Sequence, residues 1–479
     1  MTLRSLACLA LVVAVGCATN PATGRRQLIL MSEAEELQIG KESDVQIRKE
    51  MGLYPDEALQ RYVSGVGMKL VASAHRPGLP WSFAVVDEPA VNAFALPGGY
   101  IYVTRGILPY LRDEAALAGV LGHEIGHVDA RHSAEAYSKQ LGAGLGLAVA
   151  GILAPDTQPL QSLAGAGLGV LFLKYGREAE LESDRLGVGY ASQQGWDPTG
   201  VPEMLNTLAR LDAANGSRRG VPNWALTHPP AADRVQRVQE SVTAARAASP
   251  AARATNPQEF ERHLDGLVFG DSREKGIIRG NEFLHPVLRF AVSFPEGWSI
   301  SNSAERVTAT AGNESSVAML LELTEGTGPV QQQAPQQMAR AGWTQIDGDR
   351  ASINGLDAYV GTYEGVSNNA RIRIRAAHVR AGDQTYVIAG LAPAAQFSAA
   401  ASTFSSAIRT FRSLSRAEAD RIQPARMDFY VARAGDTWAS IAKGPGQAQV
   451  SASALAIMNG REPASELRPG ERLRIVVGG

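Results

Sequence analysis

His123-Glu124-Ile125-Gly126-His127 forms an H-E-x-x-H pentapeptide in the first third of the chain. In a helix, side chains at positions i and i+4 share a face, so the two imidazoles can converge on one metal ion. Glu124 lies between them, where its carboxylate can take a proton from a water on that metal. The pentapeptide therefore predicts a metal-binding helix with its own general base. The alternative is a helix whose histidines only cap and pack.

The flanking sequence favours a buried helix around this pentapeptide. Asp113 can cap its N-terminus, and the residues from Ala115 to Leu121 are small or apolar and contain no proline. A polar face on a buried helix needs partners, and a metal ion would supply one. Upstream, Asn92–Val103 is typical of two short strands around a Pro-Gly-Gly turn. Such a strand could hold a peptide substrate by edge pairing, although an ordinary hairpin fits the same pattern.

A third metal ligand has to come from elsewhere, because a catalytic zinc site usually has three protein ligands. The acidic stretch Tyr175–Gly187 is the next candidate. Glu180 and Asp184 lie four residues apart, on one face of a helix. Glu178 and Glu182 form a second pair at the same spacing. Spacing alone does not choose between the pairs, and an acidic run is also typical of a solvated helix face.

The two motifs together carry a family resemblance. H-E-x-x-H followed by R-x-x-E-x-x-A-D resembles the HtpX-like and CAAX-prenyl-protease-like zinc metallopeptidases, in particular their periplasmic BepA-like lipoprotein branch, over about residues 20–245. Arg177, Glu180 and Asp184 fit the second motif. Ser183 stands where the family usually has Ala.

The resemblance implies an α-rich zincin (gluzincin) fold with a small β-sheet and one zinc ion (Zn2+) per chain. It makes Glu180 the third zinc ligand, beside His123 and His127. Asp184 then lies behind the ligands and orients an imidazole, as metal-bound histidines usually require. Glu178 and Glu182, the other acidic pair, are then interpreted as residues of a solvated helix face.

A further segment, Leu226–Arg234, resembles the T-H-P-x-x-x-x-R stretch of the same family. The resemblance implies that His228 lies near the zinc, as a transition-state donor or as a removable fourth ligand that keeps the enzyme latent. Arg234 would stabilise an oxyanion or brace the site. The alternative for His228 is a helix-capping histidine on the surface. His132 follows His127 by five residues, off the ligand face, and is interpreted as structural.

The chemistry that the resemblance implies is peptide hydrolysis by a zinc-activated water. Zinc lowers the pKa of its bound water to near neutrality and polarises the scissile carbonyl. Glu124 accepts the water proton and passes it to the leaving amine. No covalent intermediate forms on this route.

The N-terminus predicts export. Met1–Gly16 has a basic residue and a short apolar run, which is typical of a signal peptide and too short to span a membrane. Ala14–Cys17 resembles a lipobox, so we expect lipid on Cys17, although plain secretion is the alternative. The only other cysteine, Cys8, is removed with the signal, which leaves no disulfide. By the resemblance, Ala18 after the cysteine favours the outer membrane over the inner one.

Chain length and net charge limit the possible domain organisation and the possible partners. A net charge of −2 gives no electrostatic case for nucleic acid, and 479 residues suggest three domains. The expected segments are a signal peptide at 1–16, a lipidated linker at 17–31, a zinc metallopeptidase domain at 32–248, an α+β accessory domain at 260–415 and a LysM-like domain at 427–479.

Two further details concern the linker and the metallopeptidase domain. Asn20–Arg26 resembles the polar N-P-x-T-G-R-R-Q run of periplasmic family members. Glycine-rich runs at 141–153 and 163–173 favour a helical hairpin near the active site over membrane insertion.

The second half of the chain predicts binding modules. Residues 260–415 alternate like strands, interrupted by two helical segments, and loosely resemble the Mog/PsbP-type sandwich. This sandwich-like α+β domain is expected to bind a substrate or partner. The last fifty residues resemble a small βααβ LysM domain, with Gly435–Trp438 opening its first helix and Trp438 in place of the usual Leu. LysM domains bind N-acetylglucosamine glycans, so the implied partner is peptidoglycan.

Two function classes follow from these features. One is a zinc endopeptidase, anchored in the periplasm to the inner leaflet of the outer membrane, that cleaves misfolded or stalled envelope and outer-membrane proteins. The other is an outer-membrane protein assembly factor or chaperone whose peptidase site is largely latent. Glu124 favours catalysis, while His228 allows latency.

Overall fold

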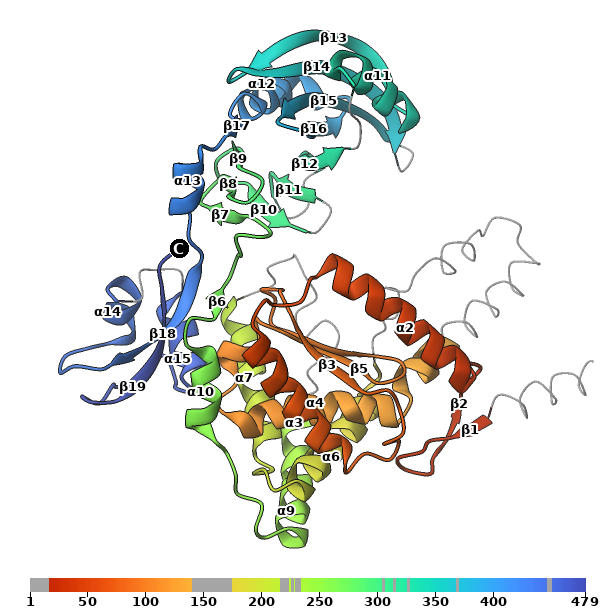
Figure 1. The fold of residues 1–479 in the computed structure, drawn as a ribbon, viewed down its shortest axis with the longest axis vertical. Coiled ribbons are helices and arrows are strands. Elements are labelled where there is room, and N and C mark those ends of the chain that lie inside the picture. The colour runs from red at the N-terminus through yellow and green to blue at the C-terminus, as the bar shows by residue number, and fades with distance from the viewer. Residues whose placement is uncertain are drawn as a thin grey trace, which may run out of the picture. The chain divides into compact units, whose positions relative to one another are not determined.

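The computed structural model describes residues 17–139, 175–215, 224, 228, 234–303, 306–312, 316–324, 328–367, 370–445 and 450–479. The chain forms two compact units (Figure 1). Unit 1 extends to Gly270 and also contains Arg426–Gly478, and unit 2 is Asp271–Ala425. The predicted signal peptide and glycine-rich hairpin lie outside the described residues. Within those residues, no helix has the length and apolar character needed to cross a membrane.

Unit 1 begins with a short hairpin and two capped helices. Strands β1 (Cys17–Thr19) and β2 (Arg26–Leu28) pair antiparallel. Helix α2 (Glu33–Glu50) starts with a capping box formed by Ser32 and Glu35, and α3 (Glu57–Val71) starts with Asp56 accepting two backbone N–H groups.

A small sheet with strand order β3-β5-β4 follows, formed by β3 (Ser82–Val86), β4 (Ala93–Leu96) and β5 (Tyr100–Thr104). Strand β5 is parallel to β3 and antiparallel to β4, as the predicted hairpin requires. The turn needs its glycines, because Gly98 and Gly99 have φ angles of 82° and 100°.

Helix α4 (Glu114–Asp129) is buried along its whole length and packs against β4, α3, α6 (Arg177–Gln193) and α7 (Gly200–Asn215). Asp113 caps it, as predicted. Glycines let α4 and α6 approach closely: a Cβ added to Gly122 would lie 3.1 Å from the Cα of Gly187. This close approach brings the two sequence motifs together.

The chain changes direction after α4. Arg131 has a φ angle of 59°, in the left-handed region that side chains rarely occupy, and residues 132–139 then form a new helical segment. The Arg131 guanidinium donates to the Glu36 carboxylate at 2.8 Å and to the Met31 carbonyl at 3.1 Å. These contacts, one to helix α2 and one to the residue just before its N-cap, hold the turn at Arg131 in place.

Helices α9 (Arg234–Ala248) and α10 (Pro257–Leu264) complete the first part of unit 1, and the chain's C-terminal segment packs onto it. Strand β18 (Ala425–Val431) pairs with β19 (Arg472–Val477) and with β6 (Val268–Phe269), and α14 (Trp438–Lys443) and α15 (Ala452–Met458) lie between β18 and β19 in sequence. The order βααβ is the predicted one. Residues 260–270, assigned above to the accessory domain, lie in unit 1 because β6 pairs with β18.

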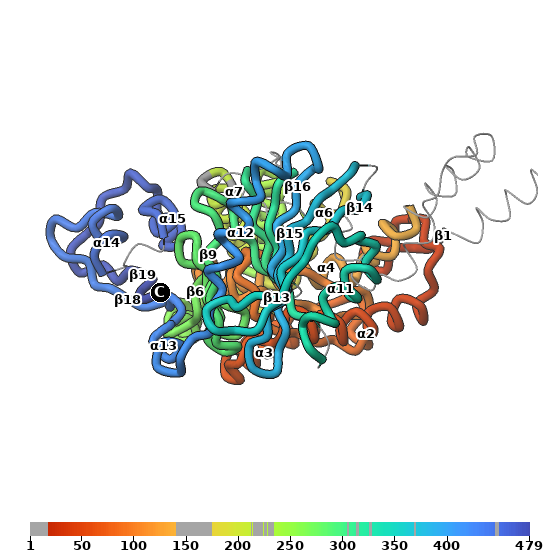
Figure 2. Tube along the Cα trace, turned by 90° about the horizontal axis from the view of Figure 1, so that it is seen from above, coloured from red at the N-terminus to blue at the C-terminus, as the bar shows by residue number. Residues whose placement is uncertain are grey.

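Unit 2 is built on an antiparallel seven-stranded sheet with the order β10-β11-β12-β16-β15-β14-β13. Figure 2 shows its long strands β13 to β16 from above. The strands are β10 (Ser299–Asn302), β11 (Arg306–Thr310), β12 (Ala318–Thr324), β13 (Thr344–Ile353), β14 (Leu356–Ser367), β15 (Ala370–Ala381) and β16 (Gln384–Pro393). A smaller sheet, β17-β9-β8-β7, consists of β7 (Ile277–Arg279), β8 (Glu282–His285), β9 (Phe290–Ser293) and β17 (Arg412–Ser413).

Both faces of the large sheet are covered. Tyr386 and Ile388 of β16 belong to one core with Phe404 of α12 (Phe397–Ile408). Val387 belongs to a second core with Met338 of α11 (Val330–Arg340). Alternation along β16 therefore fills two cores from one strand, as expected of a sheet with helices on both faces. A last short helix, α13 (Arg416–Arg421), leads back to unit 1.

Candidate metal centre

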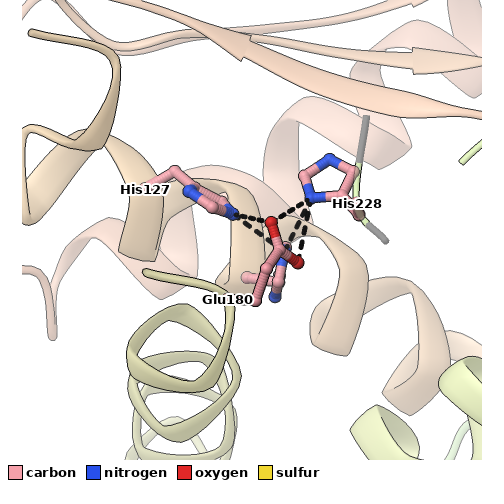
Figure 3. Close-up of side chains that lie close together, drawn as sticks. His127, Glu180 and His228 are labelled. Atoms are coloured by element: carbon pink, nitrogen blue, oxygen red, sulfur yellow. Dashed lines mark hydrogen bonds and ion pairs between the residues drawn. The ribbon is translucent and has the colours of Figure 1, made fainter. Parts of the chain in front are cut away.

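Three ring nitrogens and one carboxylate meet in the interior of unit 1. Helix α4 supplies His123 and His127, α6 supplies Glu180, and His228 comes from the segment before α9. Figure 3 shows the labelled side chains pointing toward one another. The Nε2 atoms of His123 and His127 are 3.0 Å apart, and they lie 3.7 and 3.6 Å from the Glu180 carboxylate oxygens. All four side chains are buried.

The spacing fits a tetrahedral zinc ion. Ligand atoms at about 2.0–2.2 Å from such an ion lie about 3.3–3.6 Å from one another. His228 Nδ1 is 3.3 Å from His123 Nε2 and 3.1 Å from Glu180 Oε1, and the four candidate ligand atoms all lie within 4.8 Å of one another. The residues present therefore fit a zinc ion with four protein ligands.

The tautomer of His123 also suits a metal ligand. Asp184 Oδ1 lies 2.9 Å from His123 Nδ1, and an ionised carboxylate can only accept, so the proton is on Nδ1. Burial raises the pKa of Asp184, but hydrogen bonds from His123 and Arg234 lower it further, below its ordinary value. In the neutral ring, Nε2 then carries the lone pair and lies beside the other candidate ligand atoms.

Arg234, the first residue of α9, braces the two carboxylates on α6. Its Nε and Nη2 each donate to Asp184 at 2.8 Å, and its Nη1 lies 2.9 Å from Glu180 Oε2. The side chain is almost wholly buried. Of the two roles expected for Arg234, this geometry favours bracing over oxyanion stabilisation.

Glu124 lies on the same buried helix, next to the ligands. Its Oε1 is 3.5 Å from Nε2 of His228. Within the part of the chain that the structure describes, neither carboxylate oxygen makes a hydrogen bond of normal length. Burial raises the pKa of Glu124 more than His228 lowers it. A carboxylate with open lone pairs beside a metal site is suited to accept a proton from water.

His228 is buried rather than exposed, so the surface-capping alternative is wrong. Its ring stacks on Trp224 with 4.2 Å between centroids, and its backbone N–H donates to the Trp224 carbonyl at 2.7 Å. Burial lowers the pKa of His228, but Glu180 and Glu124 raise it further, above its ordinary value. The His228 ring lies between the ligand cluster and Glu124. Its Nδ1 faces Glu180 in the cluster, and its Nε2 faces Glu124.

The sequence interpretation missed two residues behind His127. His132 Nδ1 lies 3.0 Å from His127 Nδ1, so His132 touches a candidate ligand directly. Glu182 accepts hydrogen bonds from Asn20 and Thr23, which makes its solvated interpretation wrong. Glu178 is exposed, as expected. The family-like run at Asn20–Arg26 was the signal that this segment has a place near the site.

Residues 57–242 match peptidase family M48. The chain is 33% identical over 222 residues to the beta-barrel assembly-enhancing protease of Escherichia coli, covering 44% of each protein. It is 35% identical over 181 residues to the mitochondrial metalloendopeptidase OMA1 of Schizosaccharomyces pombe, covering 37% of this chain and 52% of that one. This stretch is thus a metallopeptidase domain, and the chain spans about half the length of these relatives.

A comparison with solved structures gives no fold assignment. Cyanobacterial PsbP from Synechocystis aligns with 29% of this chain and 95% of its own, at 12% identity and a TM-score of 0.23. The Mog/PsbP-type resemblance of the accessory domain therefore stays a prediction.

Proposed function

We propose that the protein is a zinc-dependent endopeptidase of the bacterial cell envelope that hydrolyses misfolded or stalled envelope and outer-membrane proteins. The observation that carries this proposal is the buried His123, His127, Glu180 and His228 cluster beside the Glu124 carboxylate. When bound, zinc supplies a Lewis acid and lowers the pKa of a water molecule to near neutrality.

The protein's own residues divide the remaining work. His123, His127 and Glu180 would hold the ion, while Asp184 fixes the His123 tautomer. Glu124 takes the proton from the attacking water and returns it to the leaving amine. Burial of the whole cluster keeps bulk water away from these transfers.

His228 would keep the enzyme latent as a removable fourth ligand. A catalytic zinc keeps one coordination position open, whereas four protein ligands close the site. His228 Nδ1 lies at that fourth position. Movement of His228 away from the cluster would open the position and take its Nε2 away from Glu124.

Casein cleavage by the purified protein, with and without chelator, tests the assignment. Glu124→Gln should lower cleavage by about 10²–10⁴-fold with its zinc content unchanged, because only the base is lost. Cleavage by this variant at the wild-type rate, with zinc confirmed present, would refute the mechanism.

His228→Ala tests latency in the same assay. We expect higher basal cleavage and retained zinc, since three protein ligands remain. Lower cleavage would instead assign His228 as a transition-state donor. Unchanged cleavage and unchanged substrate affinity would remove it from the mechanism.

The second candidate is an outer-membrane protein assembly factor or chaperone with a largely latent peptidase site. The cluster of four candidate ligands favours it, and so does the name of the Escherichia coli relative, a beta-barrel assembly-enhancing protease. Rescue of assembly by Glu124→Gln in cells that lack the protein would favour this candidate. Loss of rescue would favour the peptidase.

Location and glycan binding belong to the same proposal. Lipid on Cys17 would anchor the chain to the inner leaflet of the outer membrane, in the periplasm, and palmitate labelling lost in Cys17→Ala tests this.

The LysM-like segment at 427–479 would bind peptidoglycan. Purified sacculi that left the full chain in the supernatant would contradict that binding. Residues 271–425 are the proposed substrate- or partner-binding module.

A further inference from the structure

Each histidine that binds a metal through Nε2 carries a proton on Nδ1, and that proton needs an acceptor. For His123 the acceptor is the Asp184 carboxylate. For His127 the described residues offer a different partner, the Nδ1 atom of His132 at 3.0 Å. His132 is 2% exposed, so water does not compete for this contact.

The contact fixes the tautomer of His132. If His127 donates from Nδ1, then His132 Nδ1 must be the acceptor and the His132 proton must be on Nε2. The Ser183 hydroxyl lies 3.3 Å from the same Nδ1 and can donate to it as well. On the other side of the ring, His132 Nε2 faces Glu182 Oε2 at 3.8 Å. A carboxylate at that position favours the N–H on Nε2.

The N-terminal turn between β1 and β2 holds Glu182 in place. Asn20 Nδ2 donates to Glu182 Oε1 at 2.6 Å, and the Thr23 hydroxyl donates to the same oxygen at 3.0 Å. The Arg25 guanidinium lies 3.6 Å from Glu182 Oε2. These three side chains come from residues 20–25 and reach α6 across more than 150 positions of sequence.

We propose that His132 is a positioning residue for the metal ligand His127, and that Glu182 and the turn at residues 20–25 hold His132 in the tautomer this requires. The inference rests on the proposed function, because it assumes that His127 binds a metal. It adds a chain of contacts, from the turn through Glu182 and His132 to His127, that is separate from the contact of Asp184 with His123.

Zinc affinity of the full-length protein, measured by competition with a chelator, tests the proposal. His132→Phe keeps a planar ring but removes the acceptor, so we expect zinc to bind about 10–100-fold more weakly. His132→Gln offers a carbonyl acceptor and should recover most of that affinity. Glu182→Gln should weaken zinc by a smaller factor, and Glu178→Gln, an exposed change on the same helix, should have no effect.

Thermal unfolding of the metal-free proteins separates positioning from packing. We expect His132→Phe and His132→Gln to unfold close to the wild-type temperature while differing in zinc affinity. The proposal is wrong if His132→Phe binds zinc like the wild type. It is also wrong if both variants lose zinc and thermal stability to the same extent. If His132→Phe does not fold, equal zinc affinity of Glu182→Gln and Glu178→Gln overturns it.

The wild-type measurement keeps this test apart from the test of the proposed function. A wild-type protein that bound no zinc would refute the metalloenzyme itself. A wild-type protein that bound zinc tightly, with no difference among the His132 variants, would refute only the positioning role.

Discussion

Arg234 offsets two buried carboxylates, that of the candidate ligand Glu180 and that of Asp184 behind His123. Its guanidinium contacts Asp184 twice and Glu180 once, and none of the three side chains is appreciably exposed. Removing one partner of such a buried set leaves the others uncompensated, which costs more than the pairing itself contributes.

Arg234→Met should therefore lower the free energy of unfolding by about 3–5 kcal/mol. Urea unfolding of the metal-free protein measures this, and Arg234→Lys, which keeps the charge, should lose less. A loss below about 1 kcal/mol for Arg234→Met would show that the carboxylates do not depend on it.

For single residues, the sequence was most informative where a known motif identifies the residues directly. H-E-x-x-H is local, so helical spacing alone placed His123, Glu124 and His127 together. Spacing did not choose Glu180 over Glu178, and the choice came from a family resemblance. The position of His132 was beyond a helical-wheel argument, because α4 ends at Asp129 and the left-handed Arg131 redirects the chain.

Among elements, the contact between α4 and α6 positions the site. A Cβ added to Gly187 would lie 2.8 Å from the His123 backbone nitrogen, a distance that packed atoms do not tolerate. The helices would have to separate, carrying Glu180 and Asp184 away from the histidines. Glycine at this position is therefore a requirement of the ligand geometry.

Gly187→Ala should weaken zinc binding and lower the free energy of unfolding by about 1–3 kcal/mol. Gly189→Ala is the matched control on the same helix, since its added Cβ would meet only the end of the Gln193 side chain at 3.9 Å. That control should gain stability, because alanine is a better helix former than glycine. Equal zinc affinity of the two variants would contradict the argument.

A buried histidine in a strand of unit 2 makes the folding stability depend on pH. Burial lowers the pKa of His378 on β15 to about 4. Its Nε2 lies 3.1 Å from Gln337 Oε1, and it is fully buried. The unfolded chain takes up the proton near pH 6.5 and the folded chain does not, so stability falls as the pH drops from about 6.5 to 4.

His378→Gln should remove this dependence. Between pH 7 and pH 5 the wild type should lose about 2 kcal/mol more than the variant. Urea unfolding at the two pH values, followed by hydrogen exchange in β14 to β16, measures the difference. His285, whose pKa burial also lowers to about 4, is present in both proteins and cancels. Equal losses in both proteins would contradict the buried, neutral His378.

Alternation of apolar residues predicted strands within residues 260–415, and β12, β14, β15 and β16 have the buried residues that give this pattern. Strand β13 lacks the pattern, because it is an edge strand whose residues are mostly exposed. Tertiary pairing with β14 creates it, and a single sequence does not contain that information.

For the whole molecule, the sequence predicted modules along the chain but not how they group. Arg474 on β19 is buried, and it donates to the carbonyls of Pro109 and Leu111, which lie just before α4. Burial lowers its pKa to about 10, so it stays charged at neutral pH. This contact holds the C-terminal segment against the peptidase part of unit 1. No local sequence pattern predicts it.

Arg474→Leu should release residues 426–478 from unit 1, because the carbonyls lose their buried donor. Limited proteolysis should then cut this segment at a lower protease concentration than in the wild type. Arg468→Ala, an exposed change in the same segment, serves as the control. Unchanged resistance of Arg474→Leu would show that the sheet β19-β18-β6 holds the segment without Arg474.

The pairing of β6 with β18 also bears on how the protein is made. A ribosome releases β6 long before β18, with the whole of unit 2 synthesised between them. The sheet β19-β18-β6 can therefore close only after unit 2 has been synthesised, while unit 2 can fold as soon as it emerges. A nascent chain stalled within unit 2 would have its metal-site helices and motifs complete, but the carbonyls that later bind Arg474 would still be open to solvent.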